Sequence, residues 1–107
     1  MSTYKKLVRD NIPDIIASNG EKPVTRKLEE EEYKKELLKK LIEESKEALE
    51  AINNKDELTK EIGDVQEVIF AVIKAFKLSD ININELRVKR KEKRGGFEKR
   101  MFLDSVE

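Results

Sequence analysis

Two short acidic runs carry the clearest chemical potential of this sequence. The first reads Glu43-Glu44-x-x-Glu47, and the second, Glu61-x-x-Asp64, follows after thirteen residues. Side chains three apart in a helix share one face, so each run would present a pair of carboxylates together. The chain has no His and no Cys. Imidazole-bound zinc, thiolate metal sites and serine–histidine chemistry are therefore excluded, and any bound metal must be a hard cation held by oxygen.

A helical projection indicates which of these acids face the interior. Glu61 and Asp64 fall inside the apolar arc of their helix, Glu44 falls inside that of the preceding helix, and Glu47 lies at its edge. A carboxylate that faces a core is costly unless it is paired or bound to a metal. Carboxylates converging from two neighbouring helices favour a site for Mg²⁺ or Mn²⁺. A structural ion pair with a lysine is the alternative.

Other acids of the same two helices have an ordinary interpretation. The projection points Glu43, Glu50 and Glu67 away from the apolar arcs, so we expect them to be solvated.

Basic residues gather near the end of the chain, although the net charge is zero. From Arg87 to Arg100 there are eight basic residues and two acidic ones. Arginine and lysine side chains can bind anionic groups such as phosphate, and the alternative is a solvated basic face. The candidates for binding such a group are Arg9, Lys89, Lys93, Arg94 and Arg100.

The elements that position these residues are expected to be helices. The chain has 107 residues, of which 37% are hydrophobic and 43% charged, with only 4 Gly and 2 Pro. This composition suits one helix-rich domain over residues 1–107 and argues against an all-β fold. The predicted helices cover residues 12–18, 29–52 and 55–76, with a fourth that opens at Asn82 to Glu85 and stops at Gly95.

The ends of these helices carry capping signals. Asn11 is expected to cap the first helix, with Pro13 in its first turn. Asn54 and Glu57 form a capping box before the third helix.

Two long helices joined by a tight link form an antiparallel hairpin, which buries little core by itself. The third helix is apolar over roughly 200° of its circumference, which needs cover from more than one side. We therefore expect a four-helix bundle completed by homo-oligomerisation, as a dimer or a tetramer.

At this point the sequence resembles a known family. The split acidic motif is similar to the signature of the MazG and phosphoribosyl-ATP pyrophosphohydrolase-like superfamily, which are all-α nucleotide pyrophosphohydrolases. The opening stretch from Lys6 to Pro13 and the ending from Lys93 to Arg100 resemble a small single-domain branch of it. Asn11 stands where that branch would have a lysine.

The resemblance implies a MazG-like four-helix fold, homo-oligomers and Mg²⁺ ligation by Glu44, Glu47, Glu61 and Asp64. It also implies hydrolysis of a nucleoside triphosphate between the α and β phosphates, which releases a monophosphate and pyrophosphate. Such hydrolysis needs charge neutralisation and an in-line water, for which Glu44 or Glu47 is the candidate base.

Three other functions stay open. A phosphoribosyl-ATP pyrophosphohydrolase of histidine biosynthesis would share the fold and the chemistry. A nucleic-acid-binding module would use the basic run, but zero net charge and the lack of interleaved aromatics argue against it. A helical oligomerisation module without activity is the third, but it would not explain why carboxylates lie within the apolar arcs of the helices. No leader or membrane-length apolar run is evident, so we expect a cytoplasmic protein without a membrane partner.

Overall fold

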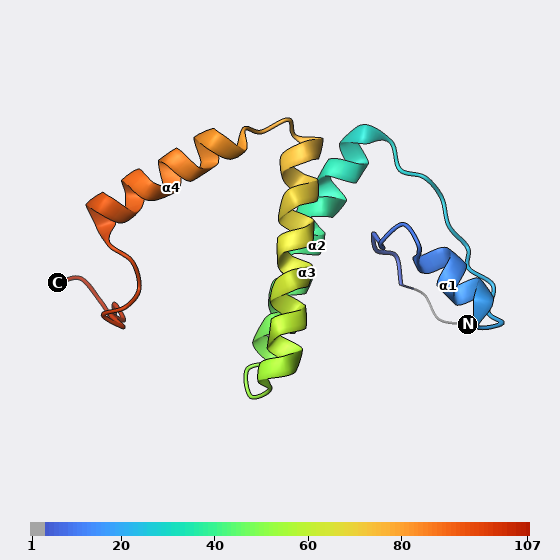
Figure 1. The fold of residues 1–107 in the computed structure, drawn as a ribbon, viewed down its shortest axis with the longest axis horizontal. Coiled ribbons are helices and arrows are strands. Elements are labelled where there is room, and N and C mark those ends of the chain that lie inside the picture. The colour runs from blue at the N-terminus through green and yellow to red at the C-terminus, as the bar shows by residue number, and fades with distance from the viewer. Residues whose placement is uncertain (1–3) are drawn as a thin grey trace. The chain divides into compact units, whose positions relative to one another are not determined.

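The computed structural model describes residues 4–107, and its regular structure over that range is entirely helical. The helices are α1 (Ile12–Ser18), α2 (Glu30–Glu50), α3 (Lys55–Ala75) and α4 (Asp80–Arg94) (Figure 1). The all-α prediction is confirmed, and the predicted bounds of α1, α2 and α3 agree with these to within two residues. None of the helices in residues 4–107 has the length and apolarity needed to cross a membrane.

The chain divides into two compact units, of which the first ends at Phe76 and the second runs from Lys77 to Glu107. The first contains α1, α2 and α3, and the second contains α4. A single domain over residues 1–107 stays a prediction.

Helices α2 and α3 pack against each other as a hairpin. The turn between them is fixed by Asn54, whose side chain accepts a hydrogen bond from the backbone N–H of Glu57 at 3.0 Å. This is the predicted cap, and it satisfies one of the free donors at the start of α3. The hairpin brings the two acidic runs onto neighbouring helices.

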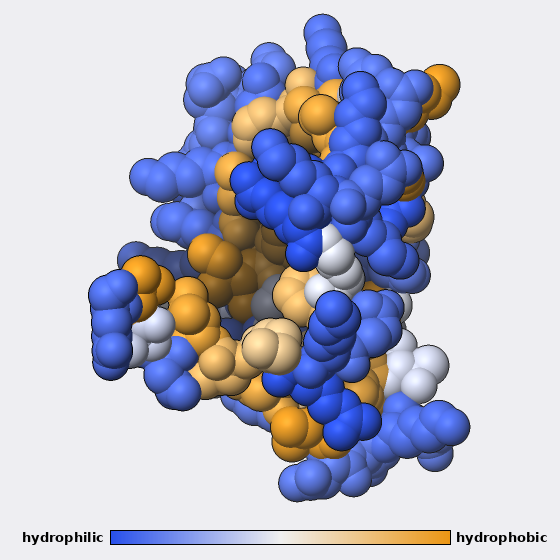
Figure 2. Space-filling view, turned by 90° about the vertical axis from the view of Figure 1, so that its left-hand side faces the viewer, coloured by the Kyte–Doolittle hydropathy of each residue, from blue (hydrophilic) through white to orange (hydrophobic). Residues whose placement is uncertain are grey.

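The core of the described chain is thin. Leu37 is the only buried apolar residue among residues 4–107, with 4% of its surface exposed. Apolar side chains of the hairpin stay uncovered, including Ile42, Ile62 and Phe70 at 61%, 47% and 63% exposure. Figure 2 shows hydrophobic surface among hydrophilic side chains on the face drawn there. The hairpin therefore leaves apolar surface in contact with solvent.

The caps of two helices differ from the predictions. Helix α4 begins at Asp80 rather than within Asn82 to Glu85, because the Ser79 hydroxyl accepts a hydrogen bond from the backbone N–H of Asn82 at 3.2 Å. Asn82 thus lies inside the first turn, and the predicted cap was wrong by three residues. Asn11 does occupy the N-cap position of α1, but its side chain makes no cap bond. Pro13 lacks one of the backbone N–H groups that such a side chain would accept from.

Candidate metal site

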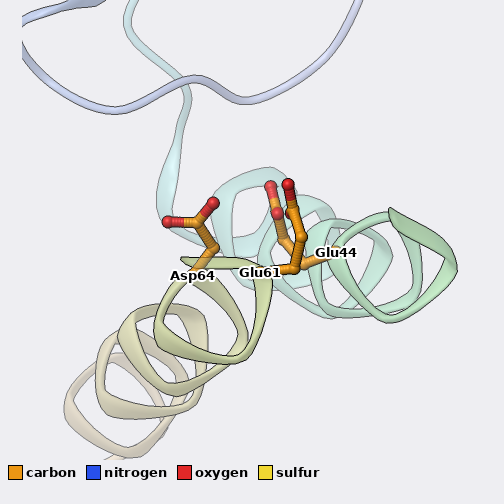
Figure 3. Close-up of side chains that lie close together, drawn as sticks. All are labelled: Glu44, Glu61 and Asp64. Carbon is orange, nitrogen blue, oxygen red and sulfur yellow. The ribbon is translucent and has the colours of Figure 1, made fainter. Parts of the chain in front are cut away.

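Three of the four predicted ligands come together across the α2–α3 hairpin. Glu44 lies on α2, and Glu61 and Asp64 lie on α3. Each offers one carboxylate oxygen, and these oxygens all lie within 4.8 Å of one another. Figure 3 shows the three carboxylates directed toward the same side of the two helices. We call these three residues the carboxylate cluster.

The cluster contains buried oxygens that lack a partner. Glu44 has only 7% of its surface exposed, and Glu61 is half-buried. In each of these two residues, Oε2 is buried without a hydrogen-bond partner. An unsatisfied buried oxygen is costly, and a buried charge without a counter-charge is more so. A hard divalent cation bound by carboxylate oxygens would satisfy both atoms, so the residues present fit Mg²⁺ or Mn²⁺.

The surroundings of Glu44 raise its pKa. Burial contributes most, followed by the neighbouring carboxylate of Glu47, with a smaller contribution from the charge of Asp64. The Nζ of Lys40, at 3.5 Å from Glu44 Oε1, acts in the opposite direction. The sequence left open that the buried acids pair with a lysine instead of a metal. Lys40 does pair with one oxygen of Glu44, but the other oxygen of Glu44 has no partner.

Glu47 lies beside the cluster but outside it. It is half-buried on α2, one turn after Glu44. Together with Glu61 it lines an open cavity of about 510 Å³ at the turn end of the hairpin. Its predicted roles as a ligand and as a base stay predictions.

Arg9 is the predicted phosphate-binding residue that lies at the cluster. Its Nη2 is 2.7 Å from Asp64 Oδ1, and both side chains are partly exposed. The second unit holds the other candidates, all exposed, and their phosphate-binding role stays a prediction. These are Lys89, Lys93 and Arg94 on α4, and Arg100 after it.

Glu43 was expected to be solvated, and the structure contradicts this. Its side chain is only 29% exposed, and its oxygens contact Lys6 Nζ at 2.9 Å and Lys40 Nζ at 3.2 Å. Burial raises the pKa of Glu43, but hydrogen bonds from Lys6 and Lys40 outweigh burial and lower it overall. The helical projection failed because it considers one helix alone and does not show where residues 4–11 lie. Glu50 and Glu67 are exposed, as predicted.

A comparison with family models shows which family the chain belongs to. The model of the MazG nucleotide pyrophosphohydrolase domain matches residues 32–96. This chain belongs to the MazG family. The matched stretch is more than half of the chain and includes both acidic runs. Neither the comparison with curated proteins nor that with solved structures gave a match. The predicted MazG resemblance is confirmed, and membership of the MazG family supports a nucleotide pyrophosphohydrolase activity.

Proposed function

We propose that this protein hydrolyses a nucleoside triphosphate between its α and β phosphates in the cytoplasm, releasing a nucleoside monophosphate and pyrophosphate. The carboxylate cluster carries the proposal: two buried oxygens without a partner lie within a group of three acids on a MazG chain. The cluster would hold Mg²⁺ or Mn²⁺.

The protein groups around the cluster have distinct proposed tasks. Glu44, Glu61 and Asp64 hold the cation, which when bound neutralises phosphate charge and lowers the pKa of water. Glu47 lies outside this group and against an open cavity. It is therefore the proposed base that accepts the proton of the attacking water.

Arg9 is the proposed phosphate ligand. Its guanidinium already lies at 2.7 Å from one oxygen of the cluster. A guanidinium presents a planar fork of donors that matches two phosphate oxygens at once. Arg9 can therefore bind a phosphate group next to the cation without a large movement.

Pyrophosphate release tests this function. The parent protein is incubated with Mg²⁺ and a panel of nucleoside triphosphates, beside Asp64→Asn and the matched control Glu67→Gln. Glu67 is an exposed acid of the same helix, one turn from Asp64. We expect equimolar monophosphate and pyrophosphate from the parent and the control, and none from Asp64→Asn.

Two other results would change the proposal. Cleavage of phosphoribosyl-ATP but of no nucleoside triphosphate would move the function to histidine biosynthesis. Equal activity of Asp64→Asn and the parent would remove the cluster from the reaction.

We also propose that the chain acts as a homo-oligomer. Ile62, Ile69 and Phe70 on α3 are 47%, 39% and 63% exposed, which is unusual for one stripe of an amphipathic helix. A second copy of the hairpin would cover this stripe and form a four-helix arrangement. Light scattering of the parent should give a molecular mass of at least two chains of 12.5 kDa each. Phe70→Glu should shift this mass toward that of a single chain. A monomeric parent would contradict the proposal.

A further inference from the structure

The segment that carries Arg9 has little regular structure of its own. Residues 4–11 form neither helix nor strand, and Lys5 adopts a left-handed backbone conformation with φ of 46°. We call residues 4–11 the N-terminal segment. Because no hydrogen-bonded ladder fixes it, its position depends on the contacts that its side chains make with the hairpin.

Two ion pairs fasten this segment to the hairpin. Lys6 contacts Glu43 on α2, and Arg9 contacts Asp64 on α3. In residues 4–107, these are the only ion pairs between groups more than six positions apart in the chain. Between them, Leu7 and Val8 are half-buried. The N-terminal segment is thus held on one helix by Lys6 and on the other by Arg9, on the side of the carboxylate cluster.

Each of these two ion pairs, which we call anchors, contributes little by itself. Lys6 and Arg9 have side chains that are 41% and 57% exposed, and exposed ion pairs contribute little because water competes for them. Two anchors on one short segment act together, since binding of the first raises the effective concentration of the second. Loss of the Lys6 anchor should therefore weaken the placement of Arg9, three residues away.

Glu43 is well suited to hold Lys6 in a fixed position. Both of its oxygens are engaged, one by Lys6 and the other by Lys40, so its carboxylate has a fixed orientation. It lies next to the proposed ligand Glu44 in the chain but is not part of the carboxylate cluster. We propose that Glu43 is a positioning residue, which fixes Lys6 and through it holds Arg9 at the carboxylate cluster. The effect on turnover rests on the proposed function, whereas the effect on the N-terminal segment does not.

A double-mutant cycle tests this assignment. The variants are Glu43→Gln, Arg9→Gln, their combination, and the control Glu50→Gln, an exposed acid on the same helix. Glu43→Gln keeps the shape of the side chain but removes the charge that attracts Lys6. We expect it to lower kcat/KM about tenfold, in the range for loss of an outer-shell partner. Combining it with Arg9→Gln should add no further loss, and Glu50→Gln should equal the parent.

A second readout does not require an active enzyme. Amide hydrogen exchange of residues 7–11 should become faster in Glu43→Gln and in Lys6→Gln, but not in Glu50→Gln. Mg²⁺ affinity of Glu43→Gln should stay close to that of the parent, because the three acids of the carboxylate cluster are unchanged. If the parent hydrolyses no nucleotide, the proposed function fails and exchange alone decides the positioning role. Unchanged hydrogen exchange in Glu43→Gln would overturn the positioning role. So would a kcat/KM of the combined variant that falls by the product of the two single losses, because the two residues would then act independently.

Discussion

The α2–α3 hairpin and the unit from Lys77 to Glu107 are similarly rich in charge, yet they use it differently. In the hairpin, Glu44 is buried, Glu61 is half-buried, and Glu43 is held between two lysines. In the second unit every residue is exposed, and residues 77–107 form no ion pair. A high density of charge therefore does not by itself make a site. In the hairpin, by contrast, a second helix shields part of the charge from water and brings three carboxylates together.

The largest expected effect comes from replacing one carboxylate in each region and comparing the two variants. Glu61→Gln removes a charge from the carboxylate cluster, and Glu85→Gln removes one from the exposed surface of α4. We expect pyrophosphate release to fall by at least about a hundredfold in Glu61→Gln, because a metal ligand matters more than its outer-shell partners. Glu85→Gln should keep the activity of the parent. Equal losses in the two variants would remove the distinction between the regions.

The second test adds metal and measures stability. A cation that binds only the folded cluster stabilises the protein by about 2.7 kcal/mol at a hundred times its Kd. Chemical unfolding of metal-free protein with increasing Mg²⁺ should show this gain, and Asp64→Asn should lose it. Hydrogen exchange should slow in α2 and α3, while α4 amides should respond less. Equal slowing in all four helices would mean that the cation does not act through the hairpin.

The features predictable from sequence were those that depend on a single helix. The apolar arc of α3 gave the side of the helix on which Glu61 and Asp64 approach α2, although the Asp64 side chain is still 42% exposed. The cap at Asn54 gave the turn that brings α2 beside them. Periodicity and caps are local, so neighbours a few positions apart determine them.

The features that sequence could not give depend on segments distant in the chain. Glu43 faces away from its own helix's apolar arc, but residues 4–11 pass over it and Lys6 neutralises it. Likewise, the pairing of Arg9 with Asp64 joins residues 55 positions apart. Neither contact has a periodic signal. The motif also could not show that Glu47 stands outside the three-acid group, because that depends on how the two helices are rotated against each other.

A smaller effect should appear in the stability of the metal-free protein at different pH. The folded protein raises the pKa of Glu44, first by burial and then through Glu47. Folding therefore favours the protonated carboxyl, and stability is lost as pH rises from the ordinary Glu value through the raised one. Glu44→Gln should be as stable as the parent at low pH and about 1 kcal/mol more stable above this window.

Urea unfolding of both proteins in a chelator, over a series of pH values, would show this difference. Glu67→Gln, an exposed acid of α3, serves as the control and should follow the parent throughout. A gain in Glu44→Gln that is the same at every pH would mean that the ionisation of Glu44 is not its cause.

The smallest expected effect belongs to the basic residues of the second unit. Lys93→Gln and Arg94→Gln remove exposed charges, so each should raise KM about two- to fivefold and leave kcat unchanged. Because exposed charges are screened by salt, the difference from the parent should shrink as ionic strength rises. Lys35→Gln, an exposed lysine of α2, is the matched control. A fall in kcat that persists at high salt would instead give the second unit a direct part in the reaction, and the contrast between the two regions would then be one of location only.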